Sequence, residues 1–314
     1  MNESQLIAVL GATGAQGGGL VRAILADPAR TFAVRAISRR VDSPAARALA
    51  SLGAEVVQGD LDDLPSLKRA FAGAHGVFGV TNFWEHFSPE REFAQAGNIA
   101  RAAQDVGAGH VIWSTLEDTR ERVPLSDTRM PTLMNRYKVP HFDAKGAADA
   151  LFQRVPTTFL RTTFFWDNLI HFGMGPKRGA DGKLNFVLPM GDRKLAGIAA
   201  ADIGSCALGI FRRGPDFIGS TIGIAGEHLT GAEMAAALSN TLAEPVNYLA
   251  MAPATYAKLG FPGADDLANM FQYYQDFSEE FLAQRPIALS RELHPGLMSF
   301  AQWLTVNGSR IPHD

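Results

Sequence analysis

The segment Leu6-Ile-Ala-Val-Leu10-Gly11-Ala-Thr-Gly14-Ala-Gln-Gly17 decides the fold. An apolar run that meets glycines at this spacing predicts a buried strand, a tight loop and the start of a helix. Gly11 permits the turn, Gly14 lets the backbone approach a pyrophosphate, and Gly17 lets the helix pack on the strand. The first amides and the dipole of the helix favour negative charge. We therefore expect Gly11, Gly14 and Gly17 to form a dinucleotide phosphate site.

Short β-branched segments alternate with amphipathic segments through residues 1–161. This alternation predicts right-handed crossovers and a mostly parallel sheet with helices on both faces, which is a doubly wound Rossmann α/β fold. The ligand crevice of such a sheet lies at the carboxyl ends of its strands. The expected strands are Leu6–Leu10, Phe32–Ser38, Ala54–Gln58, Gly76–Val80, His110–Ser114 and Thr157–Arg161, with helices such as Gly18–Ala26, Leu64–Phe71 and Pro89–Val106 between them.

The alternation stops near Thr162, where glycine and proline begin to interrupt short apolar segments. We therefore expect a Rossmann domain over residues 1–161 and a smaller, irregular α/β domain over 162–314 that covers the crevice. The chain is expected to cross between the two parts more than once. Helical patterns in the second part cover Gly231–Thr241, Pro253–Leu259, Asp265–Gln275 and Pro295–Val306.

The composition narrows the class of protein. The chain has 314 residues, of which 46% are hydrophobic and 19% charged, and this excludes intrinsic disorder. A net charge of −3 excludes a global basic surface for direct binding of nucleic acid or anionic lipid and leaves a local basic patch open. No apolar run reaches the roughly 18 residues of a membrane span, and the N-terminus does not resemble a signal peptide. We expect a cytoplasmic, soluble protein with no metal site, whose single cysteine, Cys206, forms no intramolecular disulfide.

The end of the second strand, Ile37-Ser38-Arg39-Arg40, carries no acidic residue. NAD sites usually have an acid about 20 residues past the glycines, where it binds the ribose 2′-hydroxyl. Arg39 and Arg40 instead suit a 2′-phosphate, since a guanidinium makes charge-assisted, bidentate hydrogen bonds to that group. The sequence therefore predicts NADP(H) as the cofactor. The alternative interpretation is a solvated arginine pair.

Polar residues also follow the third and fourth strands. Asp60 can accept a hydrogen bond from the adenine amino group while Leu61 packs on the ring. The alternative role for Asp60 is the N-cap of the following helix. After the fourth strand, Asn82 is a candidate for a ribose contact. The aromatic residues Phe83 and Trp84 either form a wall of the cofactor site or belong to the core.

The fifth strand ends with Ser114 and Thr115, and Pro140 predicts a helix start that places His141 and Lys145 on one helix face. A hydroxyl on strand five and a pair four residues apart that ends in lysine resemble the layout of short-chain dehydrogenases/reductases. Those enzymes use Ser or Thr, Tyr and Lys. Their Tyr is the acid–base group, and their Lys lowers its pKa and binds the nicotinamide ribose.

His141 stands at the position of that tyrosine. An imidazole titrates near pH 6.5, against about 10 for a phenol, and a neighbouring ammonium disfavours its charged form further. It would be a poor proton donor, so we favour a helix-start residue with a local hydrogen bond over a catalytic one. Lys145 either binds ribose only, which we favour, or serves as acid–base group itself. Tyr137 precedes the helix and cannot take the phenol's place by spacing.

Motifs along nearly the whole chain resemble the NmrA-like family, an atypical branch of that superfamily, and the redox-sensor members most of all. The matching segments are Gly11–Gly17, Gly53–Asp60, Val80–Glu85, Pro140–Lys145, Phe164–Leu169 and Leu259–Phe271. The resemblance implies a Rossmann fold that binds NADP(H), with a smaller C-terminal domain. It also implies cofactor contacts at Gly11, Ala12, Thr13, Gly14, Ala15, Gln16, Arg39, Asp60, Leu61, Thr81, Asn82 and Lys145, and at Phe165, Trp166, Asp167 and Asn168 beside the nicotinamide.

Two functions are compatible with this resemblance. A complete cofactor site beside an incomplete proton-transfer site favours a redox-sensing or regulatory protein, as some members of the family are regarded. The alternative is an NADPH-dependent reductase of quinones or other small electron-poor substrates, which need little general-acid help. Besides NADPH, the sequence leaves three kinds of binding partner possible: a regulatory protein, a small-molecule substrate and a second copy of the chain. The polar segment 118–139 is expected over the crevice, as a lid, a partner-binding loop or a plain insertion.

Overall fold

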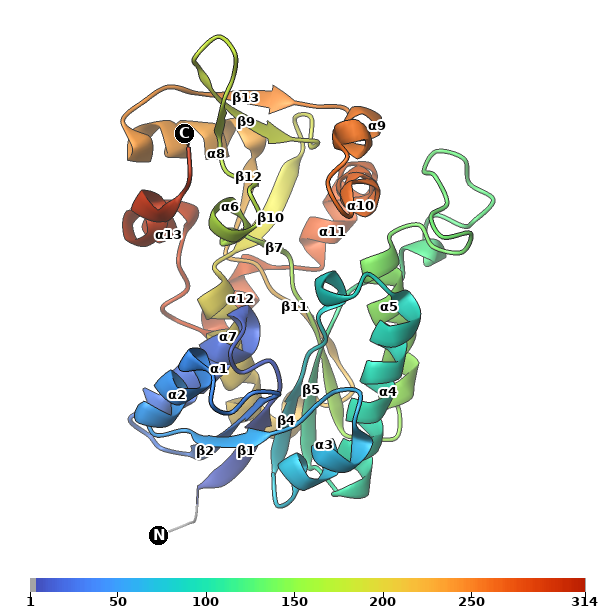
Figure 1. The fold of residues 1–314 in the computed structure, drawn as a ribbon, viewed down its shortest axis with the longest axis vertical. Coiled ribbons are helices and arrows are strands. Elements are labelled where there is room, and N and C mark those ends of the chain that lie inside the picture. Colours follow the sequence, from blue (N-terminus) through green and yellow to red (C-terminus); the bar gives the residue numbers. More distant parts are fainter. Residues whose placement is uncertain (1–3, 314) are drawn as a thin grey trace.

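The computed structural model describes residues 4–313. Its larger part is built on a seven-stranded parallel sheet with the order β11-β6-β5-β4-β1-β2-β3 (Figure 1). Strand β1 lies between β2 and β4, so the strand order reverses there and leaves a crevice at the carboxyl ends. The predicted doubly wound α/β fold is confirmed. The strands are β1 (Gln5–Val9), β2 (Phe32–Ser38), β3 (Glu55–Gln58), β4 (Gly76–Gly79), β5 (His110–Thr115), β6 (Thr157–Arg161) and β11 (Thr221–Gly223).

Helices cover both faces of the sheet because its strands are apolar on both sides (Figure 1). One face packs against α1, α2, α7 and α12, and the other against α3, α4 and α5. Cys206 of α7 lies within the first of these layers, and burial raises the pKa of its thiol to about 12, so it stays a thiol at neutral pH. The helices are α1 (Ala15–Leu25), α2 (Pro44–Ser51), α3 (Leu64–Phe71), α4 (Pro89–Asp105), α5 (Pro140–Ala148), α7 (Ala200–Arg213) and α12 (Ile287–Leu293).

Local sequence sets where several of these helices begin. Ser43, Asp63 and Ser88 accept hydrogen bonds from backbone amides in the first turns of α2, α3 and α4. Each is followed by a proline within the first two helical positions, where the missing N–H costs nothing. Asp63 is therefore the N-cap of α3, and the alternative that assigned this role to Asp60 is wrong.

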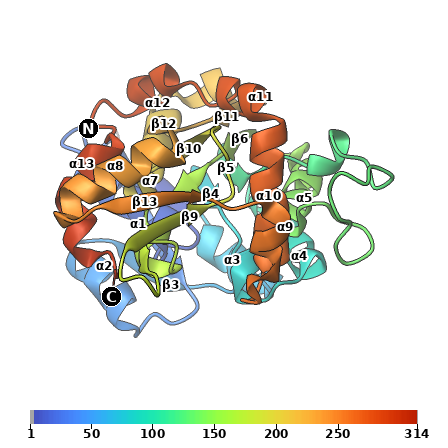
Figure 2. The ribbon, with the colours of Figure 1, turned by 90° about the horizontal axis from the view of Figure 1, so that it is seen from above.

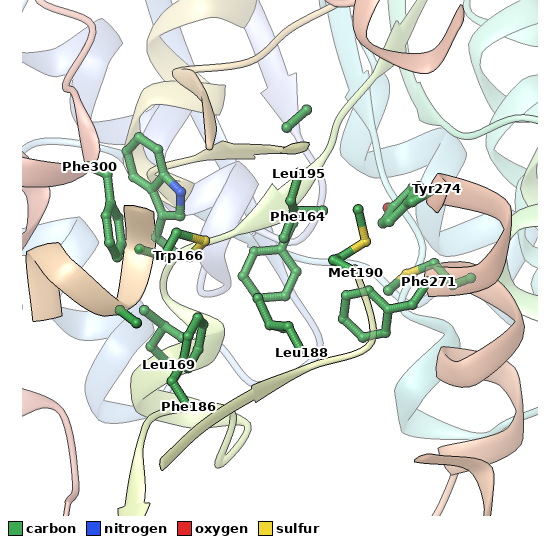
Figure 3. Close-up of a cluster of buried hydrophobic side chains, with 14 of the residues drawn as sticks. Phe164, Trp166, Leu169, Phe186, Leu188, Met190, Leu195, Phe271, Tyr274 and Phe300 are labelled. Carbon is green, nitrogen blue, oxygen red and sulfur yellow. The ribbon is translucent and has the colours of Figure 1, made fainter. Parts of the chain in front are cut away.

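The smaller part of the structure lies over the carboxyl edge of the large sheet (Figure 2). It contains two three-stranded sheets, β12-β10-β7 and β13-β9-β8. Their apolar side chains form a core with residues of α8, α10 and α13, as Figure 3 shows around Phe164. The elements are β7 (Phe164–Phe165), α6 (Asn168–His171), β8 (Lys177–Arg178), β9 (Leu184–Leu188), β10 (Lys194–Ile198), β12 (Glu227–Thr230), α8 (Gly231–Leu242), β13 (Val246–Ala250), α9 (Pro253–Tyr256), α10 (Ala264–Asp276), α11 (Ser278–Ala283) and α13 (Phe300–Asn307).

Helix α13 begins later than the expected Pro295, because Ser299 forms a reciprocal capping box with Gln302. No helix within residues 4–313 combines the length and apolar character needed to cross a membrane.

Helix α7 and strand β11 come from the second half of the chain but complete the large sheet and its helical layer. Gly204 of α7 lies directly against α1, where a β-carbon would overlap the backbone of Gly19 and Leu20. The two helices therefore approach as closely as their backbones allow. This contact ties residues 200–223 to the N-terminal strands.

Replacing Gly204 by Ala should lower the free energy of unfolding by about 1–3 kcal/mol, the usual cost of overpacking, because the helices must separate. Gly97 of α4 is the matched control, since a β-carbon there meets only the Leu151 side chain at 3.8 Å. Gly97→Ala should raise stability by up to about 1 kcal/mol. Urea unfolding of both variants tests this, and equal effects would contradict the close helix contact.

Candidate functional site

A cavity of about 560 Å³ lies between the carboxyl edge of the large sheet and the smaller part. Most residues predicted for the site line it, and they come from the ends of strands β1 to β4, from helix α5 and from the segment β7–α6. The structure thus brings together Gly11, Thr13, Gly14, Ala15, Gln16, Gly17, Arg39, Arg40, Asp60, Leu61, Thr81, Asn82, His141, Lys145, Phe165, Asp167 and Asn168.

The glycine loop has the shape that the sequence predicts. Gly11 has φ of +60°, and a β-carbon there would lie 2.8 Å from Val80 Cγ1. A side chain at Gly17 would overlap the backbone of Leu10, so α1 packs directly behind β1. Gly14 is the N-cap of α1 and offers no side chain, so the first helical amides face the cavity without a side-chain partner. These open amides fit a pyrophosphate.

Arg39 does not stand alone at the end of β2. Its Nη1 lies 2.5 Å from Oε1 of Glu85, which follows β4 in the short 3₁₀ helix η1 (Phe83–Glu85). Both side chains are about half exposed. Arg40 also lines the cavity and is exposed. Sequence analysis missed Glu85, which offers Arg39 a carboxylate partner in the place where a 2′-phosphate was expected.

Lys145 is held by a buried network that the sequence analysis did not anticipate. Its ammonium donates to the carbonyl oxygen of Thr81 at 3.1 Å and to the Thr81 hydroxyl at 2.6 Å, and lies 2.8 Å from Oε1 of Glu92. Glu92 is fully buried on α4. Three acceptors thus match the three ammonium donors. Glu92 continues the buried stripe of α4 that includes Ala96 and Ile99, and an acid within such a stripe is the signal that could have identified it.

His141 contacts a carboxylate rather than an ammonium. Its Nδ1 lies 2.6 Å from Oδ1 of Asp266 on α10, and its backbone N–H donates to Oδ2 at 3.2 Å. Both residues are buried. The expectation of a purely local hydrogen bond at the helix start is therefore wrong. The Lys145 ammonium bonds Thr81 and Glu92. No sequence signal marked Asp266 as the partner of His141, since the two residues lie 125 positions apart.

The other hydroxyls of the dehydrogenase layout are already engaged. Ser114 donates to Oε1 of Gln16 at 2.8 Å, which links β5 to the start of α1. Tyr137 donates to Glu90 at 3.1 Å and does not line the cavity. Tyr274 of α10 does line the cavity, and burial raises the pKa of its hydroxyl. Its position between Phe142 and Phe281 gave no sequence signal.

Two residues predicted to contact the cofactor do not line the cavity with their side chains. Ala12, between Gly11 and Thr13 in the glycine loop, is buried. Trp166 is 1% exposed and packs on Phe300 and Trp303 in the core of the smaller part (Figure 3). Consecutive side chains of an extended segment point to opposite sides, so Phe165 faces the cavity and Trp166 faces away from it.

The segment 118–139 does not cover the crevice, and that expectation is wrong. None of its residues lines the cavity, and Figures 1 and 2 show its loop projecting from the side of the molecule beyond α5. It is held by α10, where Asn269 donates to the carbonyls of Pro131 and Lys138. The ammonium of Lys138 is buried and donates to the carbonyls of Asp127 and Met130.

The family of the protein follows from comparison with known sequences. The sequence profile of the NmrA-like family matches residues 3–304. The chain belongs to the NmrA-like family. It is 28% identical over 299 residues, 90% of this chain and 87% of the relative, to the NmrA-like family domain-containing oxidoreductase FrzB of Cladobotryum sp..

Solved structures of similar fold hold dinucleotides. NmrA, a negative transcriptional regulator, was crystallised with NAD and with NADP, and these structures match with TM-scores of 0.78 and 0.77 at 24% and 23% identity, covering 96% of this chain and 94% of NmrA. The triphenylmethane reductase of Citrobacter sp. with NADP(H) matches with a TM-score of 0.74 at 20% identity, covering 96% of this chain and 99% of the reductase.

Asp149, next to the cavity-lining residue Thr115, has a half-buried carboxyl group with a raised pKa. Asp149 Oδ1 accepts hydrogen bonds from the Thr115 hydroxyl at 2.6 Å and from the Trp113 indole at 3.0 Å. Burial outweighs these donors and raises the pKa of Asp149 from 3.8 to about 7. The folded state therefore binds this proton more tightly than the unfolded state, and the resulting stability is full below about pH 4 and lost as the pH rises through 7.

Asp149→Asn mimics the protonated group, so it should remove this pH dependence and exceed the wild type in stability at pH 8 by about 1–3 kcal/mol. Urea unfolding at pH 5 and pH 8 measures the difference. Asp192→Asn is the control, because that side chain is fully exposed. Parallel pH profiles for wild type and Asp149→Asn would contradict the assignment.

Proposed function

We propose that this protein is an NADPH-dependent reductase of flat, apolar, electron-poor substrates such as quinones. One observation carries the proposal: the cavity at the strand ends is also lined by aromatic and apolar side chains, most of them from the smaller part, and we call this side of the cavity the chamber. The volume of about 560 Å³ is in the usual range for a ligand site. The chamber is lined by Phe83, Trp84, Phe142, Phe164, Phe165, Phe172, Met174, Leu267, Met270 and Tyr274.

The residues at the strand ends supply a role for each part of the cofactor. The amides at the start of α1 would bind the pyrophosphate, Arg39 and Arg40 the 2′-phosphate, and Asp60 with Leu61 the adenine. Asn82 would hold the ribose. Thr81 and Lys145, which are hydrogen-bonded to each other, would form the surface beneath it. Phe165, Asp167 and Asn168 would flank the nicotinamide. The reduced cofactor supplies a hydride.

A reductase explains the chamber better than a pure sensor does. A sensor needs the dinucleotide groove alone, whereas a second, apolar compartment beside it suits a second small molecule. The oxidoreductase names of curated relatives and the triphenylmethane reductase among similar folds point the same way. The repressor NmrA shares the fold too, so the regulatory role is the outcome if no substrate turns over.

Arg39→Ala should weaken NADPH binding by about 1.5–3 kcal/mol, the worth of a charged hydrogen bond, and leave NADH binding nearly unchanged. Glu85→Gln should tighten NADPH binding, because it removes the carboxylate that pairs with Arg39. Calorimetry with both cofactors tests the two variants. Equal losses of NADPH and NADH affinity in Arg39→Ala would refute the phosphate role of Arg39.

The wild type should oxidise NADPH steadily with members of a quinone panel. Leu267→Trp should reduce kcat/KM for two-ring quinones because the indole occupies the chamber, while the NADPH affinity stays the same, since residue 267 lies on α10. Absorbance at the reduced nicotinamide band follows turnover, and calorimetry follows binding. Tight NADPH binding without turnover of any panel member would replace the reductase with the regulator.

A further inference from the structure

The imidazole of His141 forms part of the chamber wall. It lies at the second position of α5, is 6% exposed, and stacks at a tilt on Trp84 with 4.7 Å between ring centroids. Phe83 and Phe142 complete its surroundings at 6.0 and 4.8 Å. A basic nitrogen heterocycle is thus presented to the cavity from an otherwise aromatic wall.

Asp266 sets which ring nitrogen carries a proton. Its Oδ1 lies 2.6 Å from Nδ1, so Nδ1 must be the protonated, donating nitrogen, and its Oδ2 accepts from the His141 backbone. With two hydrogen bonds to one residue, the carboxylate fixes the ring orientation and the tautomer together. Nε2 has no hydrogen-bond partner among the described residues. Because His141 lines the cavity, Nε2 is available to bond a ligand there.

Three other titratable groups that line the cavity are less suited to give up a proton. The ammonium of Lys145 already has three acceptors. Asp167 accepts from the backbone N–H of Ala200. Burial raises the pKa of Tyr274, which keeps its proton bound. The elements packed around His141 carry further charged and titratable groups, among them Asp266 of α10, Glu85 and His86 at η1, Glu92 of α4 and Lys145 of α5. Glu85 is paired with Arg39, and Lys145 with Glu92.

We infer that His141 is the proton donor of the proposed reductase and that Asp266 is its positioning residue. The inference rests on the proposed function. A quinone that gains one hydride from the reduced cofactor becomes a hydroquinone monoanion. The imidazolium Nε2–H then transfers its proton to the quinone oxygen, which yields the neutral hydroquinone and a neutral imidazole that takes a new proton from water. The carboxylate of Asp266 stabilises the imidazolium that this cycle requires.

The two residues lie on different parts of the structure, so the donor is oriented only where α10 packs on α5. Asp266 lies in the first turn of α10, and the same helix face presents Met270 and Tyr274 to the chamber at four-residue intervals. The helix that shapes the substrate chamber therefore also aligns the proton donor.

His141→Gln should lower kcat for a quinone at pH 7 by about 10-fold, less than the roughly 10²–10⁴-fold of a typical general acid, because the hydroquinone oxyanion is itself a stabilised leaving state. NADPH affinity by calorimetry should stay within about twofold, since the side chain lies in the chamber wall. The plot of wild-type kcat against pH should have one limb that falls as the pH rises, and the plot for His141→Gln should lack this limb. His75→Gln is the matched control, because that histidine is exposed beside the opposite end of the sheet.

Asp266→Asn keeps the shape of the residue but removes its charge. It should move the falling limb of the kcat profile to lower pH, and the NMR titration of the His141 ring in the free protein should move the same way. A purely structural role of Asp266 would change stability and leave both midpoints in place, and that result overturns the inference.

The remaining outcomes separate the two proposals. Wild-type kcat and pH profile in His141→Gln, with loss of the limb in Tyr274→Phe, would make Tyr274 the donor and overturn the inference while the reductase stands. Absence of turnover by the wild type, despite NADPH binding, would overturn the proposed function and the inference with it.

Discussion

Three consecutive glycines in the first turns of helix α1, Gly17, Gly18 and Gly19, are the constraint on which the arrangement of this molecule depends. At Gly17 the helix touches the backbone of Leu10, and at Gly19 it touches α7 through Gly204. The first contact places the helix start directly at the end of β1, with its open amides in the cavity. The second draws α7, and with it the chain that leads to β11, onto the same face of the sheet. Bulkier residues would separate these layers and move the amides away from the crevice.

Two buried polar pairs then connect the elements around the cavity. Lys145 and Glu92 join α5 to α4, and His141 and Asp266 join α5 to α10. A buried charge without a partner is costly, so each pair restricts how its two helices can pack. Helix α5 is therefore held on one side by the Rossmann layer and on the other by the smaller part, and its two functional side chains are oriented independently.

The same helix explains how this NmrA-like protein differs from the short-chain dehydrogenase layout. Lys145 occupies the lysine position, but its ammonium is already bonded to Thr81 and Glu92 within the protein. The tyrosine position holds an imidazole, which has a carboxylate partner that a phenol would not need. Both of these residues therefore have partners within the protein: Lys145 is bonded to Thr81 and Glu92, and His141 to Asp266.

Sequence alone determined the first six strands of the Rossmann sheet, the glycine loop and the strand-end residues Arg39, Asp60 and Asn82, because these strands alternate with helices in chain order and their carboxyl ends meet at one edge. The seventh strand, β11, comes from the second half of the chain and had no such pattern. Only the tertiary structure decided the partners of these residues. Glu85, Glu92 and Asp266 come from other elements, up to 125 residues away, and no local periodicity encodes a contact across that separation. It also decided that Trp166 belongs to the core and that segment 118–139 lies beside the crevice, since both depend on which surface the smaller part buries.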